Sequence, residues 1–198
     1  MPIRSFAASL AALVVLCAMP GRANAQASAA AAPGAQVTGA AGFTWGTTRA
    51  AIVAQRGAAV MEQPEAEGVT ALLYQDRVLG REVVAMFFVH PRMGLIRGGY
   101  MAPVSGAADC AMALRAFDNV VSRRYPQLEA VERTVGNAGN DVCAAARAGA
   151  GGYMKAWTDP ANHARILLMM LPGAEGPMLT YSTAQADAWE RRKNDARF

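Results

Sequence analysis

Residues 81–89 read REVVAMFFV, and residues 165–171 read RILLMML. Apolar side chains stand at successive positions in both runs, so a β-strand built from either run would be apolar on both of its faces. In an antiparallel sheet that helices cover on one side, the second apolar face must be covered by the rest of the chain, by a second copy or by a partner. The alternative is that both runs are central strands that are packed on both sides within the domain.

The two runs occupy corresponding places in two blocks of similar order. The first block, residues 43–104, opens with FTWGTT and a short helix. The second block, residues 105–183, opens with a longer helix in which apolar residues recur at helical spacing. Three strand-like runs follow each helix, namely residues 69–74, 81–89 and 95–101 in the first block and residues 153–158, 165–171 and 178–183 in the second.

An offset of 83 residues relates the strands of the two blocks. It aligns Tyr74 with Trp157 and Leu95 with Met178. The sequence therefore predicts an α+β fold of two tandem repeats, each a helix followed by a three-stranded antiparallel meander. The two repeats form one sheet with the helices packed on one face. Chance similarity between apolar strands is the alternative.

The N-terminal residues have the pattern of a secretory signal peptide. Arg4 supplies a positive charge, residues 6–19 are apolar and uncharged, and the tripeptide ANA at residues 23–25 has the small residues that signal peptidase accepts. A membrane anchor is the alternative, but the apolar segment is shorter than the roughly 18 residues that a membrane span needs. We therefore expect residues 1–25 to be removed and the mature protein to lie in the periplasm, without a stable membrane span.

The remainder of the chain divides into a leader and one domain. Residues 26–42 are mostly Ala, Gly, Ser and Gln, and they offer too few large apolar side chains to offset the entropy lost on ordering. We expect them to form a disordered leader. Residues 43–198 are predicted to be a single α+β domain that ends in a polar helix at residues 184–198.

Two cysteines, Cys110 and Cys143, remain after the predicted cleavage. In an oxidising compartment such a pair predicts a disulfide. The alternative is a nucleophilic thiol, because Ser105 could cap a helix whose early turns hold Cys110, and a helix N-terminus lowers the pKa of a thiol. That chemistry also needs a base held beside the sulfur, and neither His90 nor His163 lies in a motif that would supply one.

Composition and motifs exclude several classes of function. The chain has 19 Lys and Arg against 15 Asp and Glu, and the predicted signal peptide removes two of the arginines, so the broad basic patch of a nucleic-acid-binding protein is not expected. The sequence lacks a Gly-x-Ser-x-Gly elbow, a His-Glu-x-x-His motif, a phosphate-binding glycine loop and a Cys-x-x-Cys pair. We therefore expect no enzyme activity, no cofactor and no catalytic or metal-ligating residues.

The opening FTWGTT at residues 43–48, with the short helix and meander after it, resembles the small periplasmic domains typified by the small lipoprotein of the outer-membrane β-barrel assembly machine. Two such units in tandem resemble the β-lactamase inhibitory protein. The likeness covers the order of elements over residues 43–183, and shared residues are confined to the opening. The chain departs from the lipoprotein because no lipidation cysteine follows its signal. The resemblance implies a non-catalytic protein that binds another protein.

The sequence thus predicts an exported interaction domain, either an accessory of the cell envelope or an inhibitor or immunity-type binder. Its partner would be another envelope or secreted protein, or a second copy. The residues expected to form the binding surface are Tyr74, Phe88, Trp157 and Met169, since aromatic side chains and methionines suit an adaptable contact surface. The alternatives are a small-molecule binder, with a cavity lined by Tyr74, Phe88 and Trp157, and a cysteine-dependent hydrolase.

Overall fold

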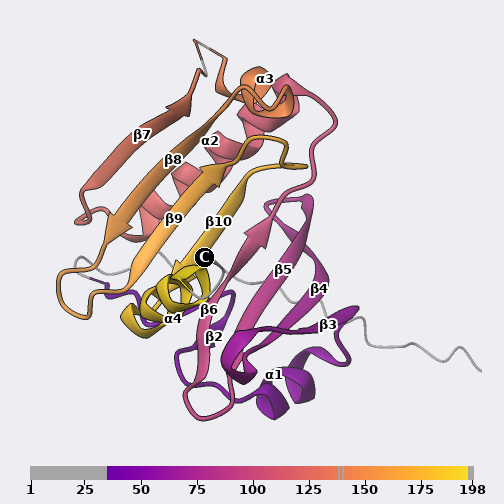
Figure 1. Cartoon of the computed structure of the whole chain (residues 1–198), viewed down its shortest axis with the longest axis vertical. Coiled ribbons are helices and arrows are strands. Elements are labelled where there is room, and N and C mark those ends of the chain that lie inside the picture. The colour runs from indigo at the N-terminus through magenta and orange to yellow at the C-terminus, as the bar shows by residue number, and fades with distance from the viewer. Residues whose placement is uncertain (1–34, 138, 140, 196–198) are drawn as a thin grey trace, which may run out of the picture.

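The computed structural model describes residues 35–137, 139 and 141–195. Eight strands in this part of the chain form one antiparallel sheet in the order β3-β4-β5-β6-β10-β9-β8-β7 (Figure 1). The strands are β3 (Met61–Pro64), β4 (Thr70–Val78), β5 (Arg81–His90), β6 (Gly94–Met101), β7 (Ala130–Gly136), β8 (Gly151–Thr158), β9 (Arg165–Met170) and β10 (Met178–Ser182). The predicted α+β class is confirmed, but each half of the sheet has four strands rather than three.

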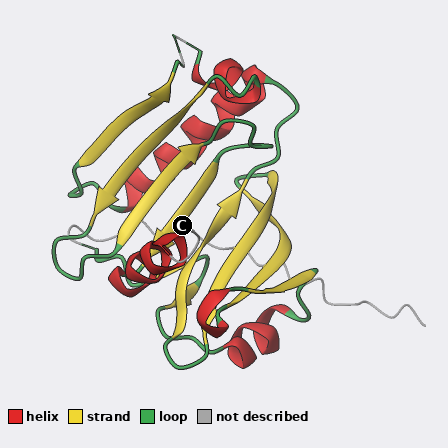
Figure 2. Ribbon diagram, viewed as in Figure 1, coloured by secondary structure: helices red, strands yellow, loops and turns green. Residues whose placement is uncertain are grey.

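The helices do not all lie on one face of the sheet, as the sequence predicted. Three of them, α1, α2 and α3, contribute to the core on one face, whereas α4 packs against the other (Figure 2). The prediction is wrong for α4 because this helix is not polar throughout: Ala186 and Trp189 are fully buried. The helices are α1 (Arg49–Arg56), the short 3₁₀ helix η1 (Ala66–Gly68), α2 (Ala107–Arg124), α3 (Val142–Arg147) and α4 (Ala184–Asp195).

The main core lies between α2 and the sheet. Alternate residues of β5 and β9 point into it, as the period of a strand requires. From α2, Ala113, Phe117 and Val121 meet them at helical spacing, and Pro126 stops that helix. The residues that β5 and β9 supply to this side are Val83, Ala85, Phe87, Ile166, Leu168 and Met170.

The structure differs from the predicted leader in its last part. The signal peptide and residues 26–34 lie outside the described residues, but residues 35–42 pack on the domain, and β1 (Gly39–Ala40) pairs with β2 (Phe43–Thr44). Val37 is fully buried, its amide donates to Asp159 Oδ2 at 2.8 Å, and its carbonyl accepts from Trp45 Nε1. One buried side chain and these hydrogen bonds therefore order a segment whose composition alone predicts disorder.

The two halves of the sheet meet where β6 pairs with β10. Gly99 lies opposite Thr180 in this pairing, and a Cβ atom at position 99 would fall 2.1 Å from the carbonyl oxygen of Leu179. Only glycine lets the two strands approach so closely at this point.

Cys110 of α2 and Cys143 of α3 form the predicted disulfide, with their Cα atoms 5.9 Å apart, and the structure places this bond within one chain. Both cysteines are buried and pack against Ala146 and Met170. The bond therefore joins α2 to α3, and both helices pack against the end of the sheet that holds Met170. Among the described residues, no helix is both long enough and apolar enough to cross a membrane.

Candidate functional site

The sheet face opposite α2 is called the open face here. On the four central strands β6, β10, β9 and β8 its side chains form three transverse rows, because directly paired residues of adjacent strands point to the same side. The rows are the polar row (Arg97, Ser182, Arg165 and Thr158), the middle row (Gly99, Thr180, Leu167 and Ala156) and the methionine row (Met101, Met178, Met169 and Met154).

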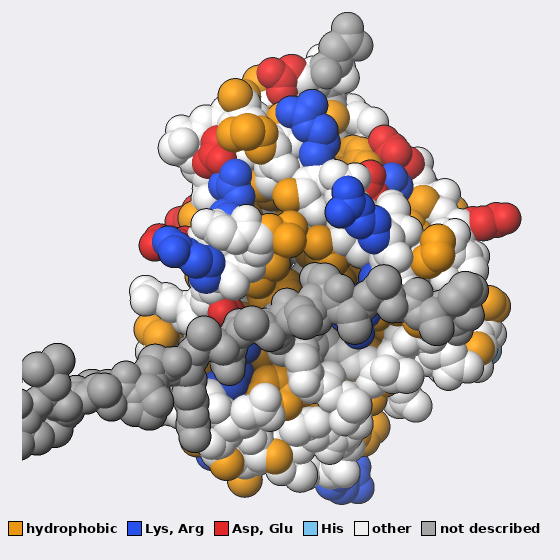
Figure 3. Space-filling model, turned by 180° about the vertical axis from the view of Figure 1, so that it is seen from behind, with side chains coloured by type: hydrophobic (Ala, Val, Ile, Leu, Met, Phe, Trp, Pro, Cys, Tyr) orange, Lys and Arg blue, Asp and Glu red, His pale blue; other side chains and the backbone are white. Residues whose placement is uncertain are grey.

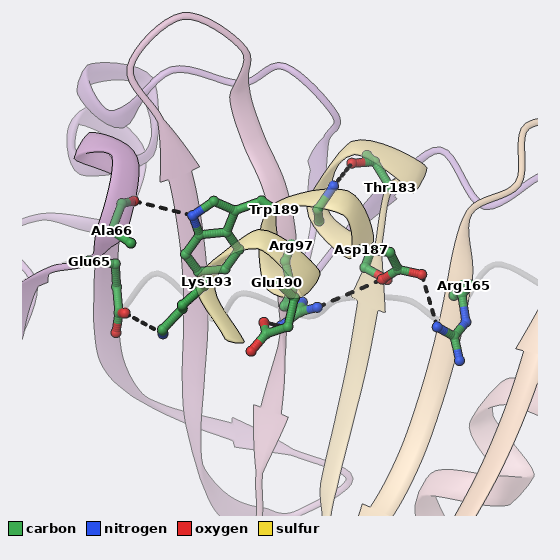
Figure 4. Close-up of polar contacts among 11 residues, drawn as sticks. Glu65, Ala66, Arg97, Arg165, Thr183, Asp187, Trp189, Glu190 and Lys193 are labelled. Carbon is green, nitrogen blue, oxygen red and sulfur yellow. Dashed lines mark hydrogen bonds and ion pairs between the residues drawn. The ribbon is translucent and has the colours of Figure 1, made fainter. Parts of the chain in front are cut away.

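Helix α4 covers Arg97, Ser182 and Arg165 of the polar row through charged contacts (Figure 4), whereas Thr158 at the end of the row is exposed. Arg97 forms ion pairs with Glu190 and, at 3.7 Å, with Asp187. Arg165 Nη1 donates to Asp187 Oδ2 at 2.9 Å, and Ser182 Oγ hydrogen-bonds to the other oxygen of that carboxylate. Acidic side chains of a helix are thus matched to basic side chains of the strands.

Trp189 anchors the same helix. Its indole Nε1 donates to the carbonyl of Ala66 at 3.2 Å, and its ring lies with its centroid 6.1 Å from that of Phe88. Val69 and Ile96 complete this small buried cluster. The hydroxyl oxygen of Thr183 accepts from the amide of Ala186 and so caps the start of the helix.

None of the described residues covers the middle row and the methionine row as α4 covers the polar row. Met154, Ala156, Leu167 and Met169 are all partly exposed. Beside them the edge strand β7 exposes every one of its residues, with Val131 58% exposed. A depression of about 590 Å³ lies here, lined by Val131, Arg133, Met154, Ala156, Thr158 and Arg165 together with residues 127–129 and Pro160.

Arg133 places a positive charge at the wall of this depression, which the acidic Glu129 also lines. It is the Cα partner of Met154 and therefore points to the open face. Its side chain is exposed, and it forms no ion pair with the part of the chain that the structure describes. The uncovered part of the open face is thus apolar, with a basic side chain available at its edge.

The structure separates the four residues that the sequence suggested for a binding surface. Tyr74 and Trp157 are 5% and 2% exposed and belong to the main core on the α2 side. Phe88 and Met169 are on the open face, where Phe88 lies against Trp189 and Met169 is in the methionine row. Tyr74, Phe88 and Trp157 therefore do not line one cavity, as the small-molecule alternative assumed.

Three side chains considered for thiol chemistry are engaged in other interactions, namely Cys110, Cys143 and His90. The disulfide leaves neither Cys110 nor Cys143 as a thiol, so the hydrolase alternative loses its nucleophile. His90 Nδ1 accepts hydrogen bonds from two backbone amides of its own turn. Burial raises the pKa of Tyr100 to about 12 and also raises the pKa of Tyr181, so both phenols stay protonated at neutral pH.

The described residues also show how possible metal ligands and surface charges are distributed. No group of three or more His, Cys, Asp or Glu side chains among them is arranged to hold a metal ion. On the α2 side of the molecule, basic and acidic side chains are interspersed rather than gathered by sign (Figure 3). A broad patch for nucleic acid is not visible there.

No protein-family model, no curated protein and no solved structure matches this chain. Function must therefore be inferred from its own residues.

Proposed function

We propose that this chain is an exported, non-catalytic protein that binds a segment of another protein on the uncovered part of its open face. The observation that carries the proposal is the exposure of apolar strand residues there, including Ala156, Leu167 and Met169, beside the depression at β7. Contiguous apolar surface of this kind marks interaction sites on monomeric proteins. The proposed role is that of an envelope accessory or an inhibitor.

The chemistry of the partner follows from the helix that already lies on this face. Helix α4 presents an apolar anchor, Trp189, together with the acidic residues Asp187 and Glu190, which pair with strand arginines. The uncovered part offers the same two elements, an apolar surface and the basic Arg133. We infer that its occupant is an amphipathic helix with an acidic edge, which would lie beside α4.

Export is supported by two independent features. The first 25 residues have the order of a charged, an apolar and a small-residue segment that signal peptides share. The disulfide between Cys110 and Cys143 would persist in the periplasm, whereas it would be reduced in most cytosolic compartments.

We also infer that the domain arose by duplication. Each half begins with a helix and has four strands that pair with their neighbours, with η1 after the first strand in one half and α3 in the other. The last strand of each half, β6 and β10, meets the other. The 83-residue offset pairs Val83 with Ile166, both in the core, and Met86 with Met169, both on the open face. The last strands, β6 and β10, do not follow it, since Leu95 is buried in the core whereas Met178 faces the open side.

A site-specific photo-crosslinker tests the proposed surface in the cells that make the protein. Placed at Ala156 or Val131 it should give a discrete cross-linked product, and placed at Met112, which is 53% exposed on α2, it should give none. The peptide attached at position 156 should have apolar residues three and four apart and acidic residues on one flank. Arg133→Glu should reduce the yield of the product.

Three results would refute this function. They are equal cross-linking at position 112, no product at positions 131 and 156, and a cross-linked peptide with neither helical spacing nor acidic residues. If the attached peptide came from the same protein, the open face would instead be an interface between two copies.

A further inference from the structure

A second cavity lies on the α2 side of the sheet, between the β1–β2 hairpin, the C-terminal end of α2 and the strands. Its volume is about 360 Å³, and β1 contacts β6 and β10 beside it, where the two halves of the sheet meet (Figure 1). Gly98 permits this close packing, since a Cβ atom there would fall 2.9 Å from that of Ala40. The walls include the apolar side chains of Phe43, Val78, Leu79 and Val120.

Three tyrosines line this cavity with hydroxyl groups that lack a partner. Tyr100, Tyr125 and Tyr181 are 8%, 4% and 7% exposed. Their hydroxyls form no hydrogen bond with the part of the chain that the structure describes. They are not sealed in the interior either, because Arg97 Nε is the one fully buried side-chain N or O atom without a partner among the described residues. The three hydroxyls are thus available to a ligand in the cavity.

Arg124 adds a cation to the same cavity. Its guanidinium carbon lies 5.7 Å from the ring centre of Tyr125, and it forms no ion pair with the described carboxylates, none of which lines the cavity. Tyr181 is the Cα partner of Gly98, so it is a diagonal neighbour of Tyr100 on the same face, within reach of an aromatic side chain. Burial raises the pKa of Tyr181, the nearby Tyr125 and Tyr100 raise it further, and Arg124 lowers it. The phenol of Tyr181 is therefore a neutral donor close to an unpaired cation.

We propose that this cavity binds a small organic carboxylate with an apolar body, and that Arg124 and Tyr181 hold the carboxylate. An ionised carboxylate only accepts hydrogen bonds, which matches a site where phenols and a guanidinium supply donors. An inorganic anion would leave the apolar walls in contact with water, whereas an organic acid covers them. The volume lies in the range of small-molecule sites.

This site is independent of the proposed partner surface, because the sheet separates the cavity from the open face. It also differs from the cavity that the sequence suggested, since Tyr74, Phe88 and Trp157 do not line it.

Titration of the full chain with 2-naphthoate and with octanoate, followed by NMR of ring-labelled tyrosine, tests the site. The chain has five tyrosines. Each acid should shift the signals of Tyr100, Tyr125 and Tyr181 saturably and leave that of Tyr153 in place. The amide 2-naphthamide, which keeps the ring and lacks the charge, should bind about 10-fold more weakly, because hydrogen bonds to charged groups are the stronger ones.

Two pairs of variants separate lost ligation from lost folding. Arg124→Gln should weaken 2-naphthoate binding about 10-fold or more, whereas Arg123→Gln, one residue earlier on α2 and outside the cavity wall, should not. Tyr181→Phe should also weaken binding about 10-fold, whereas Tyr74→Phe should not, since the Tyr74 hydroxyl donates to the carbonyl of Gly57. Because the Tyr181 hydroxyl has no partner in the described part of the chain, Tyr181→Phe should keep the thermal midpoint of the parent.

The proposal is overturned if neither acid binds saturably, if 2-naphthamide binds as tightly as 2-naphthoate, or if the binding constant is unchanged in Tyr181→Phe. Equal losses in Arg123→Gln and Arg124→Gln would overturn it as well, since they would indicate a general effect of charge. Inorganic phosphate should not displace 2-naphthoate. Displacement by phosphate at an equal concentration would contradict the assignment to an organic acid.

Discussion

Replacing Trp189 with alanine should release α4 from the open face and lower the free energy of unfolding. The indole is fully buried against Phe88, Val69 and Ile96, and its N–H satisfies the carbonyl of Ala66. Removing a buried tryptophan side chain costs about 3–5 kcal/mol, and the lost hydrogen bond accounts for about 1 kcal/mol of that sum.

The charged contacts of α4 are too weak to hold the helix once the anchor is gone. Arg165 is 41% exposed where it meets Asp187, and exposed ion pairs contribute about 0–1 kcal/mol each. In the pairs of Arg97 with Glu190 and of Lys193 with Glu65 the cations are more buried, and there the cost of removing both charges from water offsets much of their attraction. The helix has 12 residues, and isolated helices of that length are marginal in water. We therefore expect Trp189→Ala to unfold α4 locally, so that the measured loss equals the docking energy of the helix and does not exceed about 5 kcal/mol.

Urea unfolding followed by circular dichroism, together with hydrogen exchange of residues 184–195, measures both effects. Trp189→Ala should shift the midpoint to lower urea and remove the amide protection of α4, while the amides of β5 and β9 stay protected. Trp189→Phe, which keeps an aromatic ring and loses the N–H donor, should cost about 1–2 kcal/mol and keep α4 protected. Full protection of α4 in Trp189→Ala, with an unfolding free energy within about 0.5 kcal/mol of the parent, would refute this account of how the helix is held.

Three further outcomes follow from single contacts. The double variant Cys110→Ala and Cys143→Ala should lose about 3–4 kcal/mol in urea unfolding, since the bond closes a loop of 33 residues, and an unchanged midpoint would contradict this. Gly99→Ala should lower the thermal midpoint, because the added Cβ meets a backbone oxygen of β10 at 2.1 Å, and an unchanged midpoint would contradict this. The hydrogen bonds from Arg192 lower the pKa of Glu67 below its ordinary value of 4.5. The stabilisation from this pair is therefore fully present above pH 4.5 and is lost as the pH falls through the lowered pKa. Carboxyl NMR should show that Arg192→Gln raises the pKa of Glu67 again.

The elements that the sequence predicted are those with a strong periodic signal. The runs at 81–89 and 165–171 became β5 and β9, and the apolar spacing of the second block became α2. The edge strands β3 and β7 were missed because MEQP and AVERTVG are short, exposed and partly charged. Residues of that kind form strands only because a neighbouring strand already offers unpaired backbone groups.

Two of the four residues suggested for the candidate site lie on the open face. The sequence shows that residues of a strand alternate between two faces, but it does not show which face each set points to. Sequence reasoning left open whether one face of the sheet is uncovered and selected four side chains for a binding surface, but Tyr74 and Trp157 point to the core and only Phe88 and Met169 to the open face. A shift of the strand register by one residue moves every side chain to the opposite face of the sheet. The sequence alone does not show which alternate set of residues packs against the helices. The methionine row was out of reach, because it depends on the registers of three strand pairs at once.

The apolar residues on the open face are covered in one half of the sheet and not in the other. This difference is the reason for proposing the binding surface on β8 and β9. In the first half α4 covers Phe88 of β5, while in the second half none of the described residues covers Leu167 and Met169 of β9 in that way. An antiparallel sheet commonly has polar residues on a face that is open to water. Apolar residues on such a face are therefore explained better by binding than by folding. Ala156 lies on this uncovered surface, between the methionine row and the polar row. A charged residue at that position would block a docking helix, so Ala156→Lys should abolish cross-linking from position 131, and unchanged cross-linking would contradict the proposed binding surface.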